Sequence, residues 1–207
     1  MIELKGIYKS FDGQMIFENF SETIKDGEFI VFNGESGCGK TTLLNMIGAI
    51  ENADKGCILV DGIDIGRRKN KIKYFRDKVG FLFQNFALVE EETVEENLKI
   101  VKGIKDRQLI DDVLCRVGLK NYGNKKVYKL SGGEQQRVAL ARLILKKCDI
   151  ILADEPTGSL DKKNASMVVD ILKSLNDEGK TVVLVTHDDD IKKIGSRIIN
   201  LERRVSL

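Results

Sequence analysis

The stretch GEFIVFNGESGCGKTTLLNMIGAI, residues 27–50, decides the fold class. A short apolar run that ends in glycine predicts a buried strand, and the residues from Lys40 onward have helical spacing. Between them, Gly34 to Thr41 fits G-x-x-x-x-G-K-T in the strand-to-helix setting of a phosphate-binding loop. The glycines let backbone N–H groups converge on phosphate, and the following helix directs its positive end there. We expect Lys40 to supply a point charge to the phosphates and Thr41 a hydroxyl to Mg²⁺. The expected loop residues are Gly34, Glu35, Ser36, Gly37, Cys38, Gly39, Lys40, Thr41 and Thr42.

Outward from this loop, short apolar runs alternate with helical patterns. The run GCILVDGIDIG, residues 56–66, predicts a hairpin that turns at Asp61-Gly62, and residues 163–179 predict an amphipathic helix closed by Gly179. Such alternation predicts an α/β fold with a mainly parallel sheet and flanking helices. Further strands are expected at 79–84, 148–155, 181–187 and 197–204.

Strand signals are missing between residues 85 and 131. The run TVEENLKIVKGI opens with a capping box from Thr93 to Glu96, and RQLIDDVLCRVGL has helical spacing and stops at Gly118. We interpret about 85–131 as a helical lobe inserted into a single domain, whose α/β core is formed by 1–84 and 132–207.

Two further strand ends carry polar side chains. The apolar strand IILADE delivers Asp154 and Glu155 to the carboxyl edge of the sheet, where ligands of such folds bind. We expect Asp154 to hold Mg²⁺ through its water shell and Glu155 to accept a proton from the attacking water. His187, the only histidine, follows another strand and could hydrogen-bond a γ-phosphate or that water. Taken alone, each has a structural explanation: a solvated turn for the acidic pair, a packing role for the histidine.

A second glycine pair lies in LSGGEQQRVALAR, residues 130–142. Ser131 and Glu134 form a capping box, so a helix begins there, and Gly132 and Gly133 leave its amide groups unshielded. One interpretation is that this helix end meets the nucleotide of a second copy of the chain. The other is a capped helix that binds nothing. The residues alone favour neither.

The composition of the chain limits the classes of protein to which it can belong. The hydrophobic fraction is 42%, the charged fraction 32% and the net charge +2, which favours no nucleic-acid partner. The basic run RRKNKIK, residues 67–73, is interpreted as a solvated loop or helix face. No apolar run approaches the roughly 20 residues of a membrane span, and the first residues do not resemble a signal peptide, so we expect a cytoplasmic chain.

The chain resembles the ATP-binding cassette (ABC) ATPases along essentially its full length. The carrying motifs stand in the family's order: the phosphate loop as Walker A, FLFQN, LSGGE, IILADE, SLD and His187. The resemblance implies a P-loop NTPase fold with an N-terminal antiparallel β subdomain. It also implies bound ATP and Mg²⁺, and a head-to-tail dimer, most simply a homodimer, that closes each ATP between one copy's Walker motifs and the other copy's signature motif.

The resemblance also assigns residue roles. Gln84 would contact magnesium and the nucleophilic water, Asp161 in the segment Ser159–Asp161 would contact the partner, and Phe11 would stack on adenine. The signature would contribute Ser131, Gly132, Gly133 and Glu134. Cys38 stands where the family usually has serine, and we expect a maleimide reagent to inactivate the protein and Mg-ATP to protect it.

Within the family, LLNMIGAIE, DEPTGSLD and VTHDDD resemble the macrolide-exporter, lipoprotein-release and cell-division group. This implies a subunit that powers a membrane permease from the inner face of the membrane, with export of a peptide, antibiotic or lipoprotein. We also expect it to lack the appended regulatory domain of many sugar importers. The alternatives are a division-type cassette that controls a cell-wall hydrolase and a cassette ATPase without a membrane partner.

Overall fold

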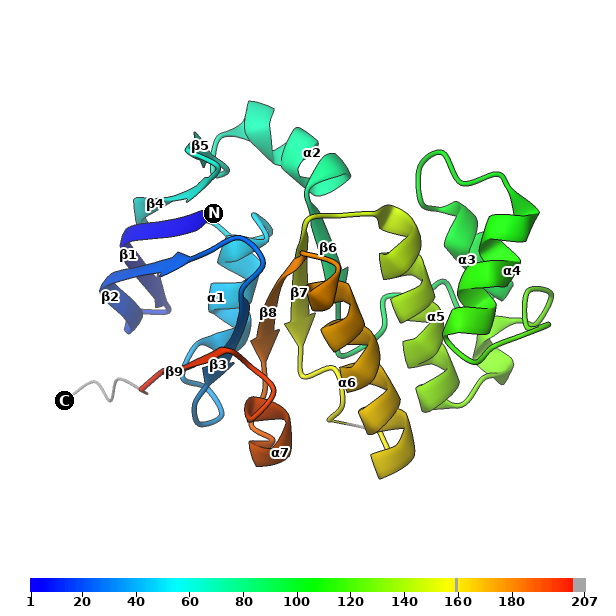
Figure 1. Ribbon diagram of the computed structural model, residues 1–207. Coiled ribbons are helices and arrows are strands. Elements are labelled where there is room, and N and C mark those ends of the chain that lie inside the picture. Colours follow the sequence, from blue (N-terminus) through cyan, green and yellow to red (C-terminus); the bar gives the residue numbers. More distant parts are fainter. Residues whose placement is uncertain (159, 203–207) are drawn as a thin grey trace.

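The computed structural model describes residues 1–158 and 160–202, which form two sheets with helices between and around them (Figure 1). The first sheet is antiparallel, with strand order β2-β1-β4-β5. Asp61 and Gly62 join its last two strands with φ of 52° and 75°, the left-handed pair that a two-residue hairpin needs, so the predicted hairpin and the antiparallel subdomain are confirmed. Its strands are β1 Ile2–Phe11, β2 Gln14–Ile24, β4 Lys55–Val60 and β5 Ile63–Asp64.

The second sheet is parallel throughout, with order β6-β7-β8-β3-β9. β3 and β7, the strands that precede the phosphate loop and Glu155, are separated in this order only by β8, which precedes His187. The parallel α/β core predicted from the strand–helix alternation is therefore confirmed. The strands are β3 Phe29–Asn33, β6 Val79–Leu82, β7 Ile150–Asp154, β8 Thr181–Val185 and β9 Arg197–Asn200.

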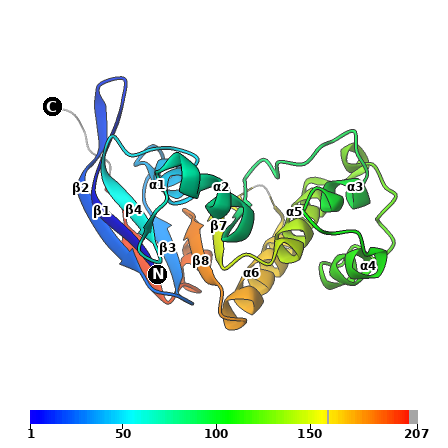
Figure 2. The same ribbon diagram turned by 90° about the horizontal axis from the view of Figure 1, so that it is seen from above.

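Helix α1 (Lys40–Ile47) lies between the two sheets, as both views show (Figures 1 and 2). Its Leu43, Leu44 and Ile47 are buried in an apolar cluster that draws on both sheets. Helix α6 (Lys162–Asp177) covers the other face of the parallel sheet, and Gly179 follows it with φ of 90°, as predicted. The remaining core helices are α2 Arg68–Asp77 and α7 Asp189–Lys192.

The helical segment begins after β6. Its α3 has the predicted Thr93–Glu96 capping box but ends at Lys99, earlier than the apolar pattern suggests, and Gly103 follows in the left-handed region. Residues Val127–Lys129 form a short 3₁₀ turn before the signature helix. The α-helices are α3 Val94–Lys99, α4 Arg107–Arg116 and α5 Gly132–Lys146.

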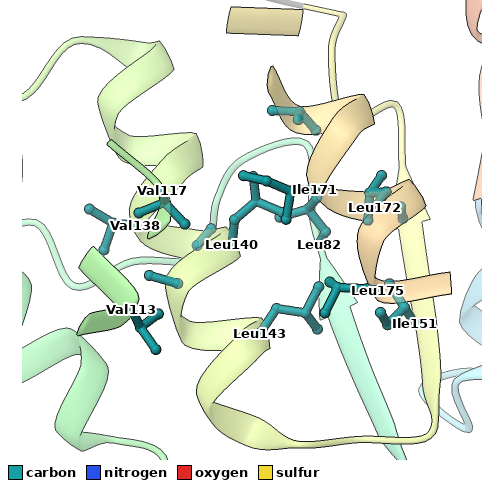
Figure 3. Packing of buried hydrophobic residues seen from close by; sticks show 14 of the residues in the cluster. Leu82, Val113, Val117, Val138, Leu140, Leu143, Ile151, Ile171, Leu172 and Leu175 are labelled. Carbon is teal, nitrogen blue, oxygen red and sulfur yellow. The ribbon is translucent and has the colours of Figure 1, made fainter. Parts of the chain in front are cut away.

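One continuous apolar cluster joins the lobe to the core (Figure 3). Val113 of α4 and Leu140 of α5 belong to the same buried group as Leu82 of β6 and Leu172 of α6. Helix α5 therefore packs on both parts, and a lobe boundary at residue 131 stays a prediction. Within the described ranges, 1–158 and 160–202, no helix has the length and apolar character to cross a membrane.

Candidate active site

The phosphate loop connects the carboxyl end of β3 to α1 and wraps around Lys40. The Lys40 ammonium is nearly buried and donates to the carbonyls of Gly34 at 2.6 Å and Glu35 at 2.9 Å. Gly39 caps α1 with φ of 98°, and a Cβ there would lie 2.4 Å from Ile16 Cγ2. Only glycine fits this position, because both the backbone conformation and the approach of β2 exclude a side chain.

This loop forms one wall of an open pocket of about 610 Å³. The carboxyl ends of β7 and β8 form another wall, so the fold brings together segments that are far apart in the sequence. Gln84 enters from the segment after β6. The lining residues are Ile16, Gly34, Glu35, Ser36, Gly37, Gly39, Lys40, Thr41, Thr42, Gln84, Asp154, Glu155, Gly158 and His187.

Two oxygen ligands suited to magnesium meet in this pocket. Thr41 Oγ1 donates to Asp154 Oδ1 at 3.2 Å. Burial raises the pKa of Asp154, while the bond from Thr41 and the charge of Lys40 oppose that rise only in part. The negative charge of the buried carboxylate is only partly balanced by its neighbours. Together with the hydroxyl, it is therefore a suitable pair of oxygen ligands for a hard cation. Within the described part of the chain no three His, Cys, Asp or Glu side chains gather to hold a metal. Where proteins bind Mg²⁺ through one or two side chains, phosphate oxygens and water usually complete its coordination.

Glu155 is held by two residues that follow β8. Its Oε1 lies 2.7 Å from His187 Nδ1, and its Oε2 accepts from Thr186 Oγ1 at 3.2 Å. Glu155 has φ of 43°, an uncommon left-handed conformation for this residue type, and its N–H donates to the Val185 carbonyl at 2.9 Å. The carboxylate is thus fixed in a partly exposed position at the pocket, where it could orient or deprotonate a water molecule.

Phe11 and Cys38 are predicted to contact the nucleotide of their own chain but do not line the pocket. Phe11 is 44% exposed at the β1–β2 turn, with Lys9 Nζ 4.6 Å from its ring centroid, so its role with adenine stays a prediction. The Cys38 side chain is only 3% exposed and packs in the apolar cluster between the sheets. That burial argues against the expected reactivity with maleimide, because the sulfur packs in the apolar cluster and against Gly34.

The signature segment lies outside the pocket. Glu134 N–H donates to Ser131 Oγ at 3.3 Å and Ser131 N–H to Glu134 Oε2 at 2.8 Å, which is the predicted capping box. Tyr122 OH also donates to Glu134 at 2.7 Å. Hydrogen bonds from the backbone N–H of Ser131 and from Tyr122 lower the pKa of Glu134. Ser131 and Gly132 are exposed and do not line the pocket of the phosphate loop. This helix end is therefore accessible to a ligand other than one bound in that pocket.

Helix α5 is tied to the segment that follows β7. Gln136 Nε2 donates to the carbonyl of Pro156, the residue after Glu155, at 2.8 Å in the interior. Arg137 donates to Asn164, which in turn donates through its backbone N–H to Asp161 Oδ1 at 2.9 Å. These bonds place the signature helix and Asp161 in one network. Ser159 lies outside the described residues.

Sequence reasoning missed Ile16 and Gly158 in the pocket wall, and Thr186, Gln136 and Asn164 among the supporting contacts. Thr186 could have been found, because it is the residue before His187 at the same strand end. Gln136 lies two residues after the end of the signature motif, but its interior position depends on how α5 rotates against the sheet. The approach of Ile16 from the antiparallel sheet has no signal in the sequence.

Comparison with known proteins identifies the family of the chain. The model of a protein family described as ABC transporter matches residues 17–158. The chain belongs to the ABC transporter family. As a cassette of this family it is an ATPase.

Several known proteins are similar to this ABC cassette along nearly its full length. It is 39% identical over 98% of its length to the macrolide export ATP-binding/permease protein MacB of Campylobacter jejuni, of which the match covers 33%. It is 38% identical over 97% of its length to the lipoprotein-releasing system ATP-binding protein LolD of Bacteroides thetaiotaomicron, covering 96% of that protein. The chain thus spans about a third of the length of the MacB relatives and nearly all of LolD.

Solved structures confirm the cassette fold. A structure described as dimeric, of the cassette MJ0796, has a TM-score of 0.90 at 39% identity and covers 98% of this chain and 95% of that one. A second structure of MJ0796, described as a dimeric post-hydrolysis state bound to ADP and phosphate, has a TM-score of 0.89 at 37% identity and covers 99% and 97%.

Proposed function

We propose that this cassette hydrolyses Mg-ATP as a head-to-tail dimer and thereby drives a membrane permease that exports a peptide, an antibiotic or a lipoprotein. The observation that carries the catalytic part is the convergence of Lys40, Thr41, Asp154, Glu155 and His187 on one pocket at the carboxyl edge of the parallel sheet.

Each pocket residue has a task that its position supports. Backbone N–H groups of the loop and the Lys40 ammonium hold the β- and γ-phosphates, and Lys40 exchanges its carbonyl partners for phosphate oxygens. Thr41, Asp154 and Gln84 are the candidates for holding Mg²⁺, which when bound neutralises charge on the phosphates. Glu155 accepts a proton from the attacking water, and His187 holds the Glu155 carboxylate and reaches the γ-phosphate.

The dimer is proposed because the signature lies outside the pocket. Ser131 and the amide groups of Gly132 and Gly133 form an exposed, capped helix end that can bind an anion. This helix end does not line the pocket formed by the phosphate loop of its own chain. In a two-fold dimer each copy offers both surfaces. The relatives described as dimeric cassettes support this assembly.

The permease partner and the export direction rest on the relatives named for macrolide export and lipoprotein release. We place the cassette on the cytoplasmic face of the membrane through such a partner, with no role for nucleic acid. Isolating the cassette from membranes and identifying the integral subunit that accompanies it tests this part. A subunit with a large extracytoplasmic domain supports export or cell-wall control, and recovery without any integral subunit contradicts the permease.

ATP turnover tests the catalytic part. We expect Glu155→Gln to bind Mg-ATP as the wild type does and to hydrolyse it at least 100-fold more slowly, because a positioned general base contributes about 10²–10⁴-fold. Glu178→Gln, at an exposed carboxylate that pairs with Arg116, is the matched control and should retain wild-type turnover. Wild-type turnover by Glu155→Gln would show that Glu155 is not the base.

A further inference from the structure

The outer face of helix α2 is basic, and the proposed mechanism of ATP hydrolysis does not use it. Residues at spacings of three and four fall on one side of a helix, so Arg68, Ile72 and Arg76 form one row and Lys69 and Lys73 the next. All five are exposed, and Ile72 is 68% exposed in the middle of the four cations. We call these five residues the α2 basic face.

The opposite side of α2 is fixed to the protein. Tyr74 is buried and its hydroxyl donates to the Ile47 carbonyl at 2.9 Å. Asn70 donates from Nδ2 to the Asp64 carbonyl at 2.7 Å. The basic face is therefore held outward by a rigid attachment, and the exposure of Ile72 is a property of the fold.

The charge of this face is largely uncompensated. Arg76 pairs with Asp77 at 2.6 Å, but Arg68, Lys69 and Lys73 have no ion-pair partner among the described residues. The cationic surface continues past the helix, because Arg76 borders a hollow that is also lined by Lys102, and the neighbouring Ile100 is 59% exposed. Cations around isolated exposed apolar side chains match an anionic lipid surface, which attracts the charges and accepts the apolar tips.

The position of α2 leaves this face free in the proposed dimer. Helix α2 leads directly into the amino end of β6, whereas the phosphate loop, Glu155 and His187 follow the carboxyl ends of β3, β7 and β8. In Figure 1 the helix lies at the upper end of the parallel sheet, and Figure 2 shows it from above. A partner that meets the carboxyl edge therefore does not cover α2.

We infer that the α2 basic face docks on an anionic lipid bilayer, with Arg68, Lys69 and Lys73 contacting headgroup phosphates and Ile72 inserting between headgroups. This goes beyond the proposed function, since it gives the cassette a membrane contact of its own in addition to any permease. Nucleic acid is a less favoured partner than a lipid surface. The side chain at the centre of the face is aliphatic, so it can neither hydrogen-bond to a base edge nor stack on a base.

The test is co-sedimentation of the full chain with vesicles at low salt. The wild type should bind vesicles of phosphatidylcholine mixed with phosphatidylglycerol, bind pure phosphatidylcholine vesicles much more weakly, and dissociate as salt rises. One basic residue near an anionic surface raises binding about fivefold, so Arg68→Gln/Lys69→Gln/Lys73→Gln should weaken it on the order of 100-fold. Ile72→Ser should cause a smaller loss that salt does not change.

The matched control is Lys120→Gln/Lys163→Gln/Lys173→Gln, which removes the same charge from exposed positions outside α2. It should bind anionic vesicles within about threefold of the wild type, because its cations do not face the bilayer. Equal losses in both triple variants, no wild-type preference for phosphatidylglycerol, or equally tight binding to a DNA duplex would each overturn the inference. ATP turnover without vesicles, measured on the same samples, shows that the variants are folded and separates this result from the test of Glu155.

Discussion

The hydrogen bond between Gln136 and the Pro156 carbonyl predicts that a residue outside the pocket controls both stability and catalysis. Gln136 is fully buried, and its Nε2 lies 2.8 Å from the carbonyl oxygen of the residue that follows Glu155. Gln136→Leu keeps nearly the same side-chain volume and removes only this bond. The Pro156 carbonyl is then left buried without a donor.

The cost can be estimated from the two ends of the bond. An unpaired buried acceptor costs about 1–3 kcal/mol. Gln136 Oε1 has no partner among the described residues, so leucine also removes one unpaired acceptor and offsets part of that cost. We expect a net loss of about 1–2 kcal/mol in the free energy of unfolding, with a fall in melting temperature of about 2–4 °C per kcal/mol for a chain of this size. We also expect kcat to fall about tenfold, since Glu155 loses a support for its backbone and small misplacements of catalytic groups are costly.

The assay pairs thermal unfolding with steady-state ATP turnover. Gln108→Leu is the control, because Gln108 donates to Asp112 on the exposed surface of α4 and should lose little of either quantity. Nucleotide affinity should be unchanged in Gln136→Leu, so the effect should appear in kcat and not in binding. A variant with wild-type melting temperature and wild-type kcat would refute the role of this bond.

Three further predictions follow from single contacts. Lys40→Ala should abolish most nucleotide binding, measured with a fluorescent ATP analogue, whereas Lys173→Ala at an exposed position should not; equal affinities would contradict the role of Lys40. Gly133→Ala should lower the unfolding free energy by about 1–3 kcal/mol, because its Cβ would lie 2.8 Å from Asn164 Cγ, while Gly132→Ala meets nothing closer than 4.0 Å; equal melting temperatures would contradict this. The lowered pKa of Glu134 means that its contribution is present above the ordinary glutamate pKa and is lost as pH falls through the folded-state value. The difference in melting temperature between wild type and Glu134→Gln should thus be larger at neutral pH than in acid, and a pH-independent difference would contradict it.

The sequence predicted the parts of this structure that local chemistry determines. These parts each depend on a few neighbouring residues, and all are found where the pattern places them. They are the glycines and Lys40 of the loop, the capping boxes at Thr93 and Ser131, and the left-handed turn at Asp61-Gly62. The convergence of three strand ends also followed, because parallel strands share a carboxyl edge.

The features that the sequence did not predict depend on long-range packing. The burial of Cys38 depends on how the two sheets enclose α1, and the exposure of Phe11 depends on where the β1–β2 turn lies relative to the loop. Neither arrangement leaves a periodic signal. The bonds of Gln136 and Arg137 likewise depend on how α5 lies against the segment after β7, so the residues of the signature helix are visible in the sequence but their partners are not.

The central claim is that each ATP is enclosed by two chains, and the molar mass of Glu155→Gln with Mg-ATP tests it most directly. Light scattering on a size-exclusion column should give about twice the 23.2 kDa of the chain with ATP and the single value without it. Adding Ser131→Arg, which places a bulky side chain at the exposed signature helix end, should keep the protein monomeric while ATP still binds. A Glu155→Gln protein that binds ATP and stays at the monomer mass, or one that dimerises equally well with Ser131→Arg, would contradict the shared site.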